Sequence, residues 1–368
     1  MAGEVPPPPQ SLMRKLRLVC ISDTHNASPL DGTFKLPQGD VLIHAGDLSR
    51  QGSFSELRKT VEWLEKADFQ AKIVIAGNHD ITLDEAFYAE HGSHFHNQQI
   101  QNPKECLELF AKAPSVTYLR HEAAVIHLSL PNGMQTTLKV FGSPYSPAHG
   151  LWAFGYPPER APTLWGEIPL DTDVVITHTP PRTHCDESPT RGAAGCEALR
   201  QALWRTRPRV AICGHVHEGR GAERVRWSFE NGIEESTWQW VDPGKDNKKK
   251  SIIDLTAKAD RALATVGSSP SAAATWSESN SRQSHRFASS AASDASNHDD
   301  QIGQRCQGGL PNARLCDLAA LSGPTCRKET CIVNAALMAS SWPYKSGGGK
   351  KYNKPIVVDI DLPNEKSS

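Results

Sequence analysis

The stretch DVLIHAGDLS, residues 40–49, is a short apolar run that ends directly in a polar cluster. Other stretches of the chain repeat this pattern: LRLVCISDTHN at 16–26, KIVIAGNHD at 72–80, DVVITHTPP at 173–181 and RVAICGHVHE at 209–218. Short continuous apolar runs are typical of strands that are covered on both faces. The pattern therefore predicts the sheet strands of an α/β fold.

Helical patterns lie between these runs. Residues 53–66 (SFSELRKTVEWLEK) place Leu57, Val61 and Leu64 at helical spacing behind a serine cap. A second helix is predicted at about 195–206. The polar clusters therefore fall at the carboxyl ends of strands, where ligands bind in open α/β sheets because loops there are free to converge.

The remaining segments differ in composition. Residues 115–147 alternate in character around a PNG turn, which predicts an added antiparallel hairpin. Residues 257–302 are mostly Ser, Ala, Asn and Asp, and too few are apolar to offset the entropy of ordering, so we expect disorder. Apolar character returns at 330–339 (TCIVNAALMA) and at 354–362 (KPIVVDIDL). We expect the C-terminus to close the core.

These segments give a predicted domain organisation. A flexible tail covers residues 1–13. A discontinuous catalytic domain covers 14–221 plus 329–363, and the insertion 222–328 lies between its two parts.

The composition gives no support to some function classes. The chain has 40 Lys+Arg against 41 Asp+Glu and a formal charge of −1, so nucleic-acid binding is not supported. The opening MAGEVPPPPQ is no secretory signal, and no uncharged run approaches the roughly 18 residues of a membrane span. We expect a soluble, cytoplasmic protein with no membrane partner; its oligomeric state is left open.

The nine cysteines form no paired Cys-x-x-Cys unit. Cys306, Cys316, Cys326 and Cys331 have spacings that fit no familiar zinc knuckle, so free thiols are favoured over a structural metal. Cys20 and Cys213 are expected to be buried strand residues.

Two polar clusters contain possible metal ligands. Asp23 and His25 lie two residues apart after a strand, a spacing that lets both grip one cation. Asp47 follows Gly46 at the end of another strand, although a lone Gly-Asp is as often a helix cap.

The remaining clusters add nitrogen and amide donors. In GNHD, Asn78 is a neutral oxygen ligand, His79 can stabilise charge or donate a proton, and Asp80 can hold the His79 ring. Further imidazoles follow later strands: His178, His215 and His217. A lone histidine at a strand end is more often bonded to backbone, but five such clusters in one order favour a metal centre. Mixed O and N donors suit Mn, Fe, Zn, Co or Ni.

The order D-x-H, GD, GNHD, H and GHxH resembles the calcineurin-like metallophosphoesterase superfamily over roughly residues 14–221. THTPP, HCD (184–186), GSPY-SP (142–147) and GHVHEGRG are similar to its metallophosphoesterase domain-containing subfamily, as are the tail segments VNAALMA and PIVVDIDLP. The resemblance implies a four-layer αββα sandwich. It also implies two divalent ions and hydrolysis of a small phosphoester, for which a nucleotide is a candidate.

The resemblance also implies a role for each motif residue. The first ion would take Asp23, His25, Asp47 and His217, and the second Asp47, Asn78, His178 and His215. Two ions about 3.5 to 4 Å apart can clamp an in-line displacement and generate hydroxide as the nucleophile. His79 would stabilise or protonate the leaving oxygen. His215 is present, whereas some subfamily members carry glycine there and are weak catalysts.

Several neighbours of the motifs have open roles. Asn26 and Arg182 could touch a phosphate or could be solvated loop residues. The histidines of HGSHFHN (91–97) are expected in a surface loop, and His44 in a buried strand. Three aromatic residues could wall the substrate pocket or pack against the sheet: Trp152, Phe154 and Tyr156.

Three functions compete at this point. A phosphodiesterase acting on substrates such as cyclic nucleotides is favoured by the subfamily resemblance. A phosphomonoesterase or protein phosphatase is the alternative within catalysis. A metal-stabilised scaffold is the alternative outside it, but scaffolds in this superfamily lack ligands or the GNH histidine, and here all are present.

Overall fold

A computed structural model describes most of the chain. The described residues are 13–129, 135–189, 192–228, 234–256, 276–278, 327–339 and 351–363. No helix in these ranges is long and apolar enough to cross a membrane.

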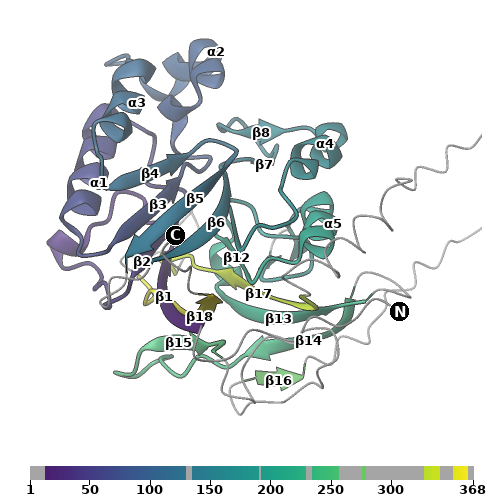
Figure 1. Cartoon of the computed structure of the whole chain (residues 1–368). Coiled ribbons are helices and arrows are strands. Elements are labelled where there is room, and N and C mark those ends of the chain that lie inside the picture. The colour runs from purple at the N-terminus through teal and green to yellow at the C-terminus, as the bar shows by residue number, and fades with distance from the viewer. Residues whose placement is uncertain are drawn as a thin grey trace, which may run out of the picture.

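One mixed sheet of six strands carries the N-terminal motifs (Figure 1). Its order is β15-β18-β1-β2-β3-β4. The strands are β1 (Met13–Ile21), β2 (Val41–Ala45), β3 (Ala71–Ile75), β4 (Val116–Leu119), β15 (Ser251–Asp254) and β18 (Ile356–Pro363). The strands β1 to β4 are parallel, and β18 runs antiparallel to β1. Because β2 and β3 are buried throughout, their sequences are continuously apolar apart from His44 and Lys72.

A second sheet of eight strands carries the later motifs. Its order is β16-β14-β13-β17-β12-β9-β6-β5. The strands are β5 (Glu122–Ser129), β6 (Gln135–Ser143), β9 (Val174–Thr177), β12 (Val210–Cys213), β13 (Gly221–Trp227), β14 (Glu234–Trp240), β16 (Trp276–Glu278) and β17 (Glu329–Asn334). The central strands β6, β9, β12 and β17 are parallel.

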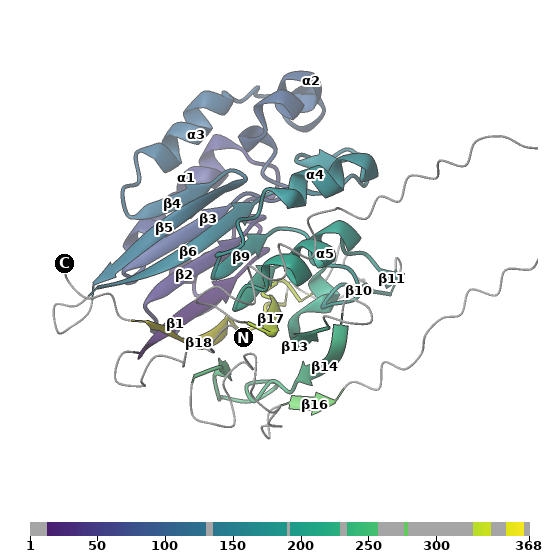
Figure 2. The same ribbon diagram turned by 45° about the vertical axis from the view of Figure 1, so that its right-hand side comes forward.

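Helices cover the outer face of each sheet (Figure 2). Beside the first sheet lie α1 (Phe54–Lys66), α2 (Glu85–Phe95) and α3 (Pro103–Ala111). Beside the second lie α4 (Ala161–Gly166) and α5 (Glu197–Thr206). One apolar cluster joins the facing sides of the two sheets, and two others join each sheet to its helices. The predicted four-layer αββα sandwich is confirmed.

Short elements complete the fold. The 3-10 helices are η2 (Pro29–Asp31), η3 (Ile81–Leu83), η4 (Pro158–Arg160) and η5 (His217–Gly219). Two small sheets pair β7 (Ser146–Pro147) with β8 (Gly155–Tyr156), and β10 (Glu187–Ser188) with β11 (Gly192–Ala193).

Both predicted helices are confirmed. The α1 helix begins after a capping box, in which Ser53 accepts from the Glu56 N–H and the Glu56 side chain accepts from the Ser53 N–H. Its residues Leu57, Val61 and Leu64 are buried against the first sheet. The α5 helix ends at Arg207, whose φ of 48° is left-handed.

The antiparallel hairpin is confirmed as β5 and β6, which pair from Glu122 with Gly142 to Ser129 with Gln135. Its PNG turn, 131–133, lies outside the described residues. The preceding strand β4 instead extends the first sheet, parallel to β3. The hairpin therefore forms the edge of the second sheet.

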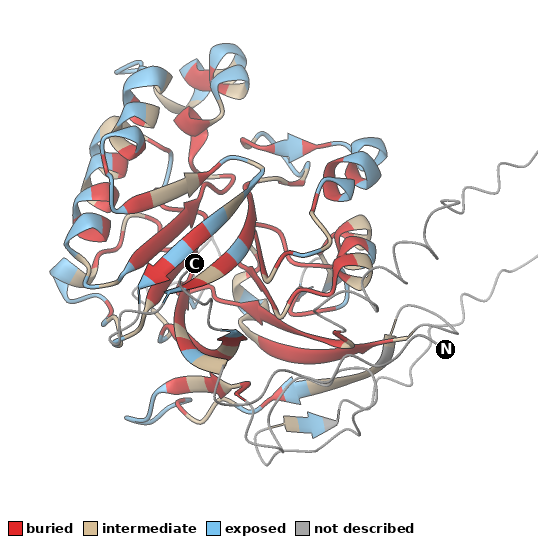
Figure 3. Cartoon of the chain, in the orientation of Figure 1, coloured by how far each residue is buried: buried red, intermediate tan, exposed pale blue. Residues whose placement is uncertain are grey.

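The C-terminal strands are also confirmed, since β17 and β18 occupy interior positions in the two sheets. The domain boundaries stay a prediction, but the expected insertion is partly built into both sheets. Strand β13 pairs with β17, and β15 pairs with β18. Figure 3 shows the central strands of the sheets buried, β13 included, whereas the edge strand β5 is partly exposed. Of the segment expected to be disordered, only β16 is described.

Buried ion pairs link β13 to β17. Glu329 is fully buried and accepts from the guanidinium groups of Arg224 and Arg226. An isolated buried charge is costly, so these partners hold one another in register.

The cysteines that the structure describes are free and buried, as expected: Cys20, Cys106, Cys185, Cys196, Cys213 and Cys331. Cys20 and Cys213 lie in buried strands. The other cysteines of the proposed zinc pattern, Cys306, Cys316 and Cys326, lie outside the described residues.

Candidate metal centre

The motif residues follow the carboxyl ends of five strands from both sheets. Loops after β1, β2 and β3 supply the oxygen donors and His25, and loops after β9 and β12 supply the other imidazoles. Several of these residues have left-handed backbone, including Asp23 (φ 54°), His25 (43°), Asp47 (54°) and His215 (67°). This conformation is uncommon outside glycine and shows that the surrounding structure holds the backbone at these positions.

Glycines allow the loops to approach closely. A Cβ on Gly214 would lie 2.0 Å from Ser22 Oγ and 2.3 Å from Asp23 Oδ2. A Cβ on Gly77 would lie 2.3 Å from Asp47 Oδ1. These positions therefore require glycine for steric reasons.

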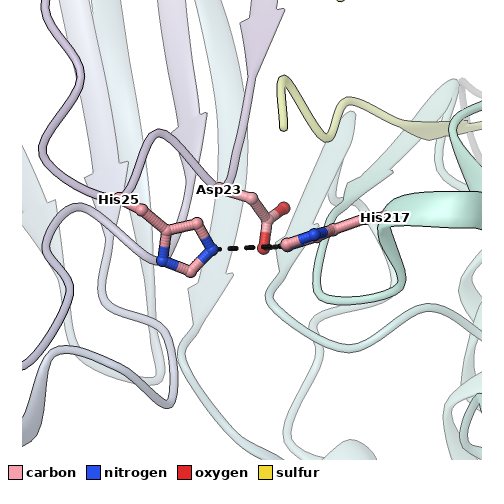
Figure 4. A group of neighbouring side chains, drawn as sticks. All are labelled: Asp23, His25 and His217. Carbon is pink, nitrogen blue, oxygen red and sulfur yellow. Dashed lines mark hydrogen bonds and ion pairs between the residues drawn. The ribbon is translucent and has the colours of Figure 1, made fainter. Parts of the chain in front are cut away.

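The first ligand group consists of Asp23, His25 and His217, which point toward one another in Figure 4. His217 Nε2 lies 3.3 Å from Asp23 Oδ1 and 3.3 Å from His25 Nε2. Donor atoms that converge this closely from two loops form a candidate cation site.

The second ligand group gathers around Asn78. Its Oδ1 lies 3.0 Å from His178 Nε2 and 2.8 Å from His215 Nδ1. Asp47 lies between the two groups: its Oδ1 is 3.4 Å from His178 Nε2, and its Oδ2 is 3.7 Å from His25 Nε2. The structure thus brings all seven expected ligands together, with Asp47 facing both groups.

Electrostatics keep the carboxylates ionised. Burial raises the pKa of Asp23, but its hydrogen bond to His217 and the charges of His217 and His178 outweigh that effect and hold the pKa at about 2. Burial likewise raises the pKa of Asp47, yet His178 and His79 hold it well below its usual range. Divalent cations bind ionised carboxylates and neutral imidazoles, so a bound cation would replace the protons that these histidines hold beside the carboxylates.

His79 stands at the edge of this cluster and is half-buried. Its backbone N–H donates to Asp47 Oδ1 at 2.9 Å, and its ring Nδ1 lies 2.8 Å from the Arg50 carbonyl oxygen. Its ring centroid is 4.7 Å from that of His25 and 4.1 Å from that of Trp152. These contacts fix the ring orientation and engage Nδ1 rather than Nε2.

The expectation that Asp80 holds the His79 ring is wrong. The buried Asp80 carboxylate accepts from Gly77 N, Leu48 N, Ser49 N and Ser49 Oγ at 2.6 to 3.1 Å. Asp80 therefore ties the GNHD loop to the GD loop, and the Arg50 carbonyl takes the expected ring contact. Backbone partners such as this carbonyl leave no side-chain signal in a sequence.

The two predicted phosphate contacts are placed differently. Asn26 has left-handed backbone (φ 67°) directly after His25, and its Oδ1 is buried without a hydrogen-bond partner among the described residues. Arg182 is exposed in the loop after β9, with its N–H bonded to Cys196 O. Their roles stay predictions.

The three aromatic residues that could line the pocket or pack against the sheet differ in position. Trp152 packs on His79 beside the candidate site, lies 5.7 Å from the ring of Phe95, and also packs against the apolar cluster of the first sheet. Phe154 and Tyr156 are buried in the apolar clusters.

The other histidine predictions can also be compared with the structure. His44 is buried in β2, 2.9 Å from Thr24 Oγ1, as expected. The surface-loop prediction for His91, His94 and His96 is wrong, because the first two lie on α2 and the third is its C-cap. None of the three belongs to a metal-binding group among the described residues.

The calcineurin-like phosphoesterase family model matches residues 16–219, more than half of the chain. The chain therefore belongs to this family.

Relatives support this assignment. Human metallophosphoesterase domain-containing protein 1 is 34% identical over 212 residues, covering 56% of this chain and 61% of that protein. A UPF0046 protein of Caenorhabditis elegans is 34% identical over 223 residues, covering 60% and 69%. A probable rhamnogalacturonate lyase C of Emericella nidulans is 44% identical over 216 residues, covering 58% of this chain.

The coverage of these relatives is partial. The chain spans 18% of the Emericella nidulans protein and 61% of the human one. Among solved structures, a purple acid phosphatase from yellow lupin seeds is 13% identical with a TM-score of 0.31, covering 66% of this chain and 42% of that chain.

Proposed function

We propose that this protein is a phosphodiesterase with a dinuclear metal centre. The observation that carries the proposal is the position of Asp47, whose two carboxylate oxygens face separate ligand groups at 3.4 and 3.7 Å. A carboxylate shared in this way is suited to bridging two cations. The cations would be Mn, Fe, Zn, Co or Ni, because the donor set mixes imidazole nitrogen with carboxylate and amide oxygen.

Each ion would have four protein donors. The first would use Asp23, His25, Asp47 and His217, and the second Asp47, Asn78, His178 and His215. Bound divalent ions supply Lewis-acid stabilisation of the phosphoryl group and activation of water.

The protein's own groups orient the reaction. The Arg50 carbonyl and the Trp152 ring hold the His79 side chain. With Nδ1 engaged, Nε2 is the atom that would stabilise charge on the leaving oxygen or give it a proton. The buried Asp80 keeps the GNHD and GD loops in fixed relation, which preserves the position of His79 beside Asp47.

The preference for a diester rests on the resemblance of the sequence motifs to the metallophosphoesterase domain-containing subfamily. A nucleotide-like substrate and a cytoplasmic location belong to this proposal.

The test compares bis-p-nitrophenyl phosphate with p-nitrophenyl phosphate in the presence of Mn, Ni, Co, Fe or Zn. We expect metal-dependent hydrolysis with kcat/KM at least about tenfold higher for the diester, a difference of about 1.4 kcal/mol in the barrier. Faster hydrolysis of the monoester would favour the phosphomonoesterase alternative and overturn the proposal.

A further inference from the structure

Asn334 lies at the carboxyl end of β17 and is fully buried. Its Nδ2 donates to the carbonyl oxygens of Val216 at 2.8 Å and Cys185 at 2.9 Å, and it lies 3.5 Å from that of Gly214. Its Oδ1 accepts from Ala336 N at 3.1 Å. Both ends of this amide are thus engaged, and the donor end is directed at loop backbone.

Two of these carbonyls belong to the loop that presents His215 and His217. Gly214 precedes His215, and Val216 lies between the two histidines. Because the Asn334 carboxamide contacts carbonyls on both sides of His215, it restricts the loop more than a single hydrogen bond would. The packing is close, because a Cβ on Gly219 would lie 3.2 Å from Asn334 Nδ2.

The next residues connect the two sheets. Ala335 N donates to Cys213 O of β12, in the same sheet, at 2.8 Å. Leu337 N donates to Ser22 O, after β1 of the other sheet, at 2.9 Å, and Ser22 also forms an isolated bridge with Ala336. Ser22 directly precedes Asp23. Residues 334–337, named the 334–337 brace, therefore bond to the loops of both sheets that carry the first ligand group.

We propose that Asn334 is a positioning residue of the metal centre. Through the brace it fixes the distance between the Asp23 loop and the His215–His217 loop, where His215 N lies 3.1 Å from both Asp23 carboxylate oxygens. Asn334 lies outside the residues that match the family model, 16–219. This proposal rests on the proposed metal binding. It adds that tight metal binding requires a residue from the C-terminal part of the chain.

The physical reason is preorganisation. Metal ligands held by outer hydrogen bonds bind more tightly, and loss of such a partner typically weakens metal affinity or activity by about 10- to 100-fold. Asparagine serves here because it both donates and accepts. Aspartate has the same shape but cannot donate, so its oxygens would face the Val216 and Cys185 carbonyls with like partial charge.

The test compares Asn334→Asp and Asn334→Ala with a control in the same strand, Thr330→Ala. Thr330 is fully buried, and its Oγ1 accepts from Trp227 Nε1 at 2.9 Å. The control therefore also removes a buried hydrogen bond from β17 without touching a ligand loop. Mn affinity is measured by competition with a chelating dye, and melting temperature with EDTA and with Mn.

We expect both Asn334 variants to bind Mn about 10- to 100-fold more weakly than the wild type, with the control within about twofold. The Mn-induced rise in melting temperature should fall in the Asn334 variants and persist in the control, because that rise follows affinity. If Asn334→Asp does not fold, Asn334→Ala gives the same comparison.

An Asn334→Ala protein that melts lower in EDTA but keeps wild-type Mn affinity would show a purely structural role and overturn the proposal. A wild type that binds no divalent ion would instead overturn the proposed function, so the two failures are distinguishable.

Discussion

Two buried histidines six residues apart, His178 and His184, have carboxylate partners but different surroundings. His178 lies in the metal centre, beside Asp47 and Asn78. His184 lies between Glu223, 2.5 Å from Nδ1, and Glu234, 2.9 Å from Nε2. For both imidazoles, burial lowers the pKa, but carboxylate partners outweigh it and raise the pKa to about 9.

The two sites differ in how many groups contact each donor atom. Each nitrogen of His184 contacts its own carboxylate, and Arg200 donates to Glu234, so two positive side chains are matched by two negative ones. In the metal centre, Asn78 Oδ1 contacts two histidine nitrogens, and His25 Nε2 meets His217 Nε2 at 3.3 Å. Donor atoms crowded around common points are what a cation requires. Perturbed pKa values alone do not distinguish a ligand site from a structural ion pair.

The largest effect is expected for Asp47→Ala. Removing the carboxylate that faces both ligand groups should lower bound metal below one ion per chain. The kcat for diester hydrolysis should fall below about one-hundredth of the wild-type value, because losing a direct metal ligand costs more than losing a residue that hydrogen-bonds to a ligand. Metal analysis and diester hydrolysis measure the two effects. Retention of wild-type metal content would contradict the bridging role.

His79→Ala should separate catalysis from metal binding. Bound metal is expected to stay near two ions per chain, while kcat falls about 10²- to 10⁴-fold, the usual contribution of a general acid. The control is His91→Ala, which alters a histidine of α2 outside the ligand groups. Equal kcat in both variants would remove His79 from the mechanism.

His184→Gln should affect stability in a pH-dependent way and leave metal content unchanged. A folded-state pKa of about 9 for His184 exceeds the unfolded value of about 6.5. The stabilisation is therefore complete below pH 6.5 and is lost as the pH rises toward 9. The charged groups that face this imidazole are Glu223 and Glu234, with Arg200 behind the latter.

Urea unfolding of the wild type and His184→Gln at pH 6 and pH 9.5 measures the difference. The wild type should exceed His184→Gln in free energy of unfolding by more at pH 6 than at pH 9.5. A gap that is constant with pH would show that the imidazolium is not the stabilising form.

The smallest effect is expected for deletion of residues 260–300. Of the described residues this removes only the three-residue edge strand β16. Diester hydrolysis should stay within about twofold of the wild type, because edge strands of this length add little to a sheet. Collapse of the fold would show that the segment is structural.

Local signals in the sequence predicted the α/β fold and the placement of the ligands at strand ends, whereas the four-layer sandwich was implied by the family resemblance. Apolar runs mark the buried strands, and parallel strands bring their carboxyl ends to one edge. The sequence did not reveal that β13 belongs to the second sheet, because Arg224 and Arg226 resemble solvated residues until Glu329, more than 100 positions later, pairs with them. The partner of His79 is a backbone carbonyl, and Asn334 acts on backbone, so neither contact has a side-chain pattern.

Anomalous scattering from crystals soaked in Mn tests the central claim most directly. The account predicts two peaks per chain, about 3.5 to 4 Å apart, on either side of the Asp47 carboxylate. A single peak, or peaks away from Asp47, would contradict a dinuclear centre built on these seven residues.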